Sequence, residues 1–105
     1  MTLMLSENQL KQFDEEGWLF FEDVFDATEV SVLNQEAHRI FAMEREEVFR
    51  EKDGTTARTA FAAQNYNEAY RRLGRHPRLV EPVKQLLSGD VYMHQFKINA
   101  KAAFN

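Results

Sequence analysis

Val91-Tyr92-Met93-His94-Gln95-Phe96-Lys97-Ile98-Asn99-Ala100 is the most regular segment of this 105-residue chain. Its residues are typical of a strand, in which successive side chains point to opposite faces of a sheet. We therefore expect a strand over residues 91–100. One face would carry Tyr92, His94, Phe96 and Ile98, and the other would carry Val91, Met93, Gln95, Lys97 and Asn99.

Two capping boxes upstream of this segment mark the starts of helices. Ser6-Glu7-Asn8-Gln9 and Asp26-Ala27-Thr28-Glu29 each pair a capping side chain with a Glu or Gln three residues later. The first helix should end at Gly17, since glycine accepts a left-handed conformation. The second should run over residues 27–50, because apolar residues recur at helical spacings. This apolar stripe consists of Val30, Leu33, Ala37, Ile40, Phe41 and Val48.

The remaining segments predict shorter elements. Trp18-Leu19-Phe20-Phe21 suits a strand buried on both faces, so we interpret its aromatic side chains as core rather than cofactor contacts. Residues 58–62 are a further strand candidate after a turn at Asp53-Gly54. Two more helices are expected, over residues 67–73 (closed by Gly74) and residues 76–89. The chain is therefore predicted to be α+β and mostly helical, with about four helices and two or three strands in a single unit over residues 1–105.

The composition argues against several classes of protein. The formal net charge is -4, and acidic and basic residues are interleaved, unlike a nucleic-acid-binding surface. No apolar run approaches the roughly 18 residues of a membrane span. The first ten residues lack a signal-peptide pattern, so we expect a cytoplasmic protein. One basic stretch, interpreted as a solvated helix face with an anion contact as the alternative, comprises Arg71, Arg72, Arg75 and Arg78.

The order of these motifs resembles the opening third of the phytanoyl-CoA dioxygenase family, in its ectoine-hydroxylase-like branch. The resemblance is strongest over residues 90–101, followed by Phe104. Three earlier segments also match: Leu10-Lys11-Gln12-Phe13-Asp14-Glu15-Glu16-Gly17-Trp18-Leu19, Val24-Phe25-Asp26 with Glu29-Val30, and Arg58-Thr59-Ala60-Phe61.

The resemblance implies the N-terminal segment of a double-stranded β-helix, or jelly roll, that uses Fe(II) and 2-oxoglutarate. The metal in such enzymes is held by two His residues and one carboxylate. One His and the carboxylate form a His-x-Asp or His-x-Glu pair, and the resemblance places this pair and the second His after residue 105. Consistent with this, none of His38, His76 and His94 is followed two residues later by Asp or Glu. The chain alone is therefore expected to contain no catalytic or metal-binding residue, to bind no cofactor, and to be inactive. The full enzyme would hydroxylate a small molecule such as an amino acid derivative, with halogenation left open.

The same resemblance assigns binding roles to four residues. Gln95 and Asn99 would face the barrel interior and contact 2-oxoglutarate, since their amides donate to carboxylates while remaining neutral. Lys97 and Arg58 would contact the substrate. The alternatives are that the strand residues are ordinary polar positions and that Arg58 pairs with a helix carboxylate.

A different class of function also remains open. The chain could be a non-catalytic helical interaction module, or a remnant of such an enzyme. If no further strand covered residues 91–100, that strand would be an exposed sheet edge, which favours self-association. The oligomeric state distinguishes these possibilities.

Overall fold

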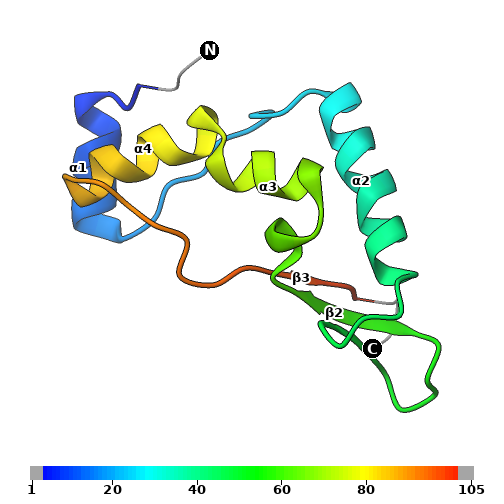
Figure 1. Ribbon diagram of the computed structural model, residues 1–105. Coiled ribbons are helices and arrows are strands. Elements are labelled where there is room, and N and C mark those ends of the chain that lie inside the picture. Colours follow the sequence, from blue (N-terminus) through cyan, green and yellow to red (C-terminus); the bar gives the residue numbers. More distant parts are fainter. Residues whose placement is uncertain (1–3, 102–105) are drawn as a thin grey trace.

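A helix begins at each predicted capping box in the computed structural model, which describes residues 4–101 (Figure 1). Helix α1 (Glu7–Glu16) starts where the Ser6 hydroxyl accepts a hydrogen bond from the Gln9 amide. It ends at Gly17, whose φ of 83° is left-handed. Helix α2 (Ala27–Phe41) starts at Asp26 with the same reciprocal pattern. Both predicted helix starts are confirmed.

The prediction that α2 continues to residue 50 is wrong. The helix ends at Phe41, and strand β1 (Val48–Arg50) follows a short turn. Val48 fits the helical stripe by spacing, but it pairs with Ala60 across an antiparallel ladder and is buried there. The pairing with a distant strand therefore decides the structure of this segment.

Three short strands form one antiparallel sheet in the order β1-β2-β3 (Figure 1). Strand β2 (Ala57–Phe61) follows a hairpin in which the Asp53 carboxylate accepts from the Thr55 and Thr56 amides. Strand β3 (Lys97–Asn99) pairs with β2 only, so its other edge has no neighbour among the described residues. The strand predicted over residues 58–62 is confirmed, shifted by one residue.

Two other strand predictions need correction. The strand expected over residues 91–100 is limited to Lys97–Asn99, and residues 91–96 lie outside regular secondary structure. Residues 18–21 do not form a strand; Trp18 is 57% exposed and Phe20 is 73% exposed. A strand requires a ladder of hydrogen bonds to a neighbour. Residues 91–96 make one backbone bond of this kind, in which the Ala62 amide donates to the Phe96 carbonyl at 2.9 Å, and residues 18–21 make none within the described part of the chain. Phe104 of the resembling motif lies outside the described residues.

The helical segment between β2 and β3 contains a one-turn 3-10 helix, η1 (Ala63–Asn65), that the sequence did not indicate. Helix α3 (Glu68–Arg75) is capped by Asn67, and α4 (Pro77–Leu87) is capped by His76. The expected ends were misplaced: Gly74 lies inside α3, and the left-handed cap of α4 is Ser88 rather than Gly89. The α+β class is confirmed. No helix in residues 4–101 is both long and apolar enough to cross a membrane.

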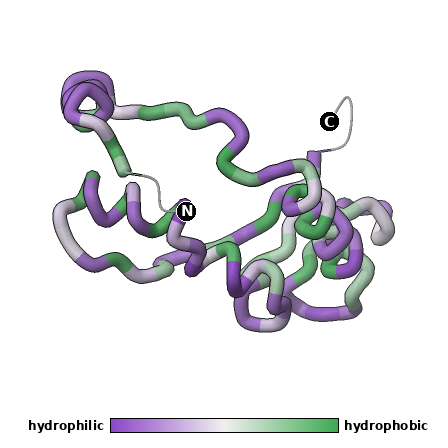
Figure 2. Tube along the Cα trace, turned by 90° about the horizontal axis from the view of Figure 1, so that it is seen from above, coloured by the Kyte–Doolittle hydropathy of each residue, from purple (hydrophilic) through white to green (hydrophobic). Residues whose placement is uncertain are grey.

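The hydrophobic core is small and lies where α2, α3 and the sheet meet. Its centre is Ile40, which is 0% exposed. The buried cluster contains Ile40, Val48, Ala60, Ala63 and Tyr70, with Phe96 and Ile98 packed against it. Hydrophobic residues also occur along segments of the chain that lie away from this core (Figure 2).

The accessible surface is large for a chain of this size. It measures 8192 Å², whereas a compact monomer of 12.3 kDa exposes about 6,100 Å². The radius of gyration is 16.2 Å, against about 13 Å for a compact domain of this length. The chain therefore exposes roughly 2,000 Å² more surface than a compact monomer. This excess is larger than the area of about 800 Å² that each partner buries in a typical protein–protein interface.

The Asn67 cap provides a test of helix placement. Asn67 is buried, its side-chain oxygen accepts from the Tyr70 amide, and its nitrogen donates to Glu36 of α2. Asn67→Ala is expected to lower the free energy of unfolding by about 1 kcal/mol, because the first turn of α3 loses its cap. Urea denaturation followed by circular dichroism measures this. Asn34→Ala, at an exposed position of α2, is the control and should not destabilise; equal effects of the two changes would contradict the prediction.

Candidate functional site

The face of the sheet turned away from the core forms a hollow of about 540 Å³. Cross-strand pairs set this face: Phe49 lies opposite Thr59, Thr59 opposite Asn99, and Phe61 opposite Lys97. Val48, Ala60 and Ile98 point to the core instead. The lining residues are Phe49, Glu51, Arg58, Thr59, Phe61, Lys97, Asn99, Ala100 and Lys101.

Three of the four residues expected to bind ligands line this hollow: Arg58, Lys97 and Asn99. Gln95 does not. It is exposed in the segment before β3, where strand alternation no longer directs it to this face. Lys97 and Asn99 therefore share one face of the sheet, as strand alternation predicts, whereas Gln95 lies outside β3. The ligand-binding roles of all four residues stay predictions.

A β-bulge directs Arg58 into the hollow. Strict alternation from the core residue Ala60 would turn Arg58 toward the core. The register shifts between Phe49, which pairs with Thr59, and Arg50, which pairs with Ala57. Arg58 is thus the extra residue of the bulge, and bulges commonly re-aim side chains beside functional sites. Arg58 forms no ion pair with a carboxylate of residues 4–101, so the alternative of a helix partner is not found there.

The hollow carries more positive than negative charge. Arg58, Lys97 and Lys101 line it together with a single carboxylate, Glu51. The Thr59 hydroxyl donates to the Asn99 side-chain oxygen at 3.1 Å, which orients the amide. The side-chain nitrogen of Asn99 (Nδ2) has no hydrogen-bond partner among the described side chains and is available as a donor. This arrangement suits an anion. Four further residues of the hollow were not predicted from the sequence: Thr59, Phe49, Phe61 and Lys101. Strand alternation along β2 could have identified Thr59 and Phe61.

Iron does not fit the described residues. Within residues 4–101, no group of three or more His, Cys, Asp or Glu side chains is placed to hold a metal ion. His76 caps α4 by accepting from the Arg78 amide at 3.1 Å. His94 is exposed and lies edge-on to Tyr92. The described residues therefore do not form an iron site by themselves.

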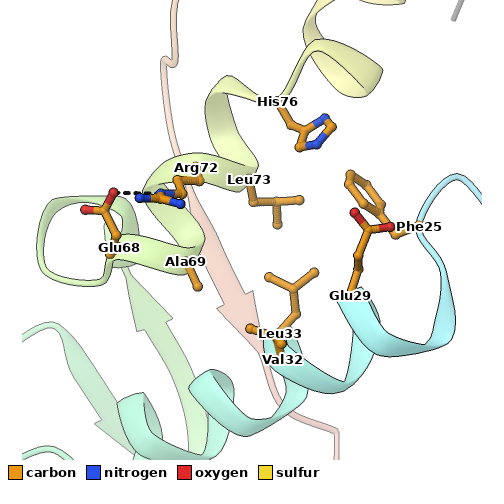
Figure 3. Close-up of a pocket in the computed structure, with 9 residues that line it drawn as sticks. All are labelled: Phe25, Glu29, Val32, Leu33, Glu68, Ala69, Arg72, Leu73 and His76. Atoms are coloured by element: carbon orange, nitrogen blue, oxygen red, sulfur yellow. Dashed lines mark hydrogen bonds and ion pairs between the residues drawn. The ribbon is translucent and has the colours of Figure 1, made fainter. Parts of the chain in front are cut away.

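A second hollow, of about 490 Å³, lies between α2 and α3 (Figure 3). Leu33 and Leu73 contribute to its apolar walls, and charged side chains surround them. These charges are paired within the chain: Arg72 donates to Glu68 at 3.0 Å, and the Glu29 carboxylate binds Arg78. These pairs leave no charged side chain of the rim free to bind a ligand. We therefore interpret this hollow as a gap between packed helices rather than a ligand-binding site.

The Arg78–Glu29 pair joins the start of α2 to α4. Two guanidinium nitrogens donate to the two Glu29 oxygens at 2.9 and 3.0 Å, and one also donates to the Val24 carbonyl at 2.8 Å. The guanidinium carbon lies 5.0 Å from the centre of the Phe25 ring. Arg71 similarly donates to the Gln64 carbonyl. Most of the basic stretch is thus engaged internally, which argues against the alternative of an anion contact.

Acid should weaken this connection. The hydrogen bonds from Arg78, and then the Asp26 amide, lower the pKa of Glu29 to about 2, below about 4.3 in an unfolded chain. A lowered pKa contributes stability that is present above about pH 4.5 and is lost as the pH falls toward 2. Glu29→Gln should therefore be less stable than wild type at pH 6, and the difference should shrink toward pH 2. Thermal unfolding across pH measures this, with the exposed Glu16→Gln as control. A difference that is independent of pH would contradict the assignment.

Known proteins resemble this chain over almost its whole length. Ectoine dioxygenase of Bordetella parapertussis is 32% identical over 104 residues, which cover 95% of this chain and 34% of the relative. L-proline trans-4-hydroxylase of Streptomyces griseoviridis is 34% identical over 92 residues, covering 88% of this chain and 34% of the relative. The chain thus spans about a third of the length of the curated relatives it matches.

A comparison with solved structures also finds a protein of this kind. The crystal structure of EctD from S. alaskensis with 2-oxoglutarate and 5-hydroxyectoine matches with a TM-score of 0.80 and 28% sequence identity, covering 90% of this chain and 35% of that one. The family model described as phytanoyl-CoA dioxygenase (PhyH) matches residues 13–105. Since this match includes nearly all of the sequence, the chain belongs to the phytanoyl-CoA dioxygenase family.

Proposed function

We propose that this chain is the N-terminal portion of a non-haem, Fe(II)/2-oxoglutarate-dependent dioxygenase that hydroxylates a small molecule such as an amino acid derivative. The observation that carries the proposal is the cationic hollow on the sheet, which brings Lys97 and Asn99 together beside the bulged Arg58. A cytoplasmic location, expected from the sequence, belongs to the same proposal.

The residues of the hollow would bind and orient anions. The sequence assigned Lys97 to the substrate, but it lies in the hollow beside Asn99, so we assign it to 2-oxoglutarate instead. The Lys97 ammonium and the Asn99 side-chain amide would donate to a carboxylate of 2-oxoglutarate, and the hydrogen bond from Thr59 would hold the amide in place. Arg58 would contact the substrate. Gln95 would join the 2-oxoglutarate site if β3 extended to residue 95 on pairing with a further strand.

The excess surface supports a larger fold. A jelly roll that follows this segment would cover the free edge of β3 and the exposed aromatic residues Trp18 and Phe20. That part of the protein would hold the iron, which activates O₂ together with 2-oxoglutarate when bound. Residues 4–101 would then supply one wall of the binding site.

The test is turnover by the natural gene product that contains this segment. It would be supplied with Fe(II), O₂ and 2-oxoglutarate, and succinate release would be measured with ectoine, L-proline and related compounds. We expect 2-oxoglutarate-dependent succinate release that at least one such compound stimulates. Absence of both succinate release and 2-oxoglutarate binding would overturn the proposal.

The free edge of β3 favours a second candidate, a non-catalytic module that associates with itself. Pairing of two β3 edges would hide part of the excess surface. Sedimentation velocity of the 105-residue chain separates the two functions when combined with the turnover assay. A discrete dimer without enzymatic turnover would favour the module.

A further inference from the structure

The segment before β3 lies outside regular secondary structure, but it contacts helix α3 at two points. The Phe96 ring lies edge-on to Tyr70, with ring centres 5.9 Å apart and planes at 67°. Met93 lies beside Gly74, where an added Cβ would be only 2.8 Å from the Met93 Cε atom. Tyr70 and Gly74 are four residues apart in α3 and therefore share one face of the helix. The segment is thus packed along this face of α3.

Tyr70 holds its position independently of β3. Its side chain is buried, and its hydroxyl donates to the Leu33 carbonyl of α2 at 2.8 Å. Phe96 is half-buried and packs, like Ile98, against the buried cluster that contains Tyr70. The contact with Tyr70 therefore gives Phe96 a defined place on the core side of the sheet.

Strand β3 has few other contacts that fix its register. Its ladder with β2 has three pairs, and its other edge has no neighbour among the described residues. A shift of this ladder by one residue would turn every side chain of β3 to the opposite face. Lys97 and Asn99 would then leave the hollow. Phe96 directly precedes the strand, and its carbonyl accepts from the Ala62 amide at 2.9 Å, so its position determines which residues pair next.

We propose that Phe96 is a positioning residue for the hollow. By packing on Tyr70 it fixes the register of β3, and this register directs Lys97 and Asn99 into the hollow. Phe96 lies on the core side of the sheet, so it acts through the backbone of β3. The register itself does not depend on the proposed function, whereas its effect on turnover rests on it.

The first test is amide hydrogen exchange of the ¹⁵N-labelled 105-residue chain, without any ligand. Two amides report the pairing of β2 with β3: Ala62 donates to the Phe96 carbonyl, and Ala100 donates to the Arg58 carbonyl at 2.8 Å. In Phe96→Ala we expect both to exchange about tenfold faster relative to the amides of α2, because the aromatic contact is lost. An equal acceleration in α2 would indicate a loss of overall stability only, and would overturn the inference.

Two further variants control this test. Tyr92→Ala removes an aromatic ring from the same segment at a position that is 84% exposed, and it should leave both amides unchanged. Phe96→Leu keeps an apolar side chain and serves where Phe96→Ala does not fold. It should accelerate exchange of the same two amides several-fold relative to α2. Exchange in Phe96→Leu that equals exchange in Tyr92→Ala would contradict the inference.

The second test uses succinate release by the natural gene product. Phe96→Leu should raise the KM for 2-oxoglutarate several-fold, with a smaller change in kcat, because displaced Lys97 and Asn99 bind it less well. If the wild type turns over but Phe96→Leu has the same KM as Tyr92→Ala, the inference fails and the proposed function stands. If the wild type neither releases succinate nor binds 2-oxoglutarate, the proposed function fails, and hydrogen exchange alone decides whether Phe96 sets the register.

Discussion

Ile40→Ala is expected to leave the chain largely unfolded at 37 °C. Ile40 is 0% exposed and is the largest fully buried side chain described. Truncating such a residue costs about 2–5 kcal/mol through lost burial and the cavity left behind. Total stabilities of small domains begin at about 5 kcal/mol, and this core is smaller than usual for the chain length. The loss should therefore be comparable with the whole stability.

Urea denaturation at 10 °C, where more of the variant is folded, measures this effect. Ile40→Val, which removes one methyl group, should cost only about 0.5–1.5 kcal/mol. Val32→Ala is a matched truncation on the same helix, at a residue that is 48% exposed, and should change stability by less than about 1 kcal/mol. A cost for Ile40→Ala no larger than that of Val32→Ala would mean that the core is not centred on Ile40.

Lys97 and Asn99 should produce the largest functional effect. In the natural gene product, Lys97→Met and Asn99→Ala are each expected to lower kcat/KM for 2-oxoglutarate about 10- to 100-fold. Each removes a hydrogen bond to a charged ligand, and such bonds contribute about 1.5–3 kcal/mol. The effect should fall mainly on the KM for 2-oxoglutarate, because the contact exists before reaction as well as during it.

Lys52→Met is the control for these variants, since Lys52 is an exposed lysine in the β1–β2 hairpin. It should leave kcat/KM unchanged. Binding of 2-oxoglutarate, followed by calorimetry, gives a readout that is independent of turnover. Wild-type affinity in both Lys97→Met and Asn99→Ala would refute the assignment of these two residues to 2-oxoglutarate, even if turnover were reduced.

Local signals in the sequence predicted local structure well. The helix starts at Ser6 and Asp26 were predictable because their hydrogen bonds reach only three residues along the chain. Val48 was misassigned because a spacing of seven residues suits a helix, whereas its partner Ala60 is distant in sequence. The segment starting at Trp18 failed for a related reason. Its apolar residues indicate burial, but burial depends on a neighbour that the local sequence does not specify.

In the candidate site, too, features set by local sequence were predictable, whereas features set by pairing between strands were not. The shared face of Lys97 and Asn99 was predictable from strand alternation. The position of Gln95 was not, because β3 is shorter than the alternating pattern. Arg58 reaches the hollow only through the bulge opposite Arg50, and a bulge depends on the register of two paired strands. Phe49 was hidden in the predicted helix, so its part in the hollow could not be foreseen.

Helix α1 differs from the rest of the chain in how it is held. None of its residues is buried, and the buried cluster draws on residues 40–70 only. The described attachment before α1 includes the buried Leu5, whose amide donates to the Gln85 side chain at 2.9 Å. An element held this way undergoes local unfolding while the core stays intact. Proteases should therefore cut the exposed link between α1 and α2 first. A shortened chain that begins just before Val24 would keep both the Arg78–Glu29 pair and the core, which makes it the better starting point for crystallisation.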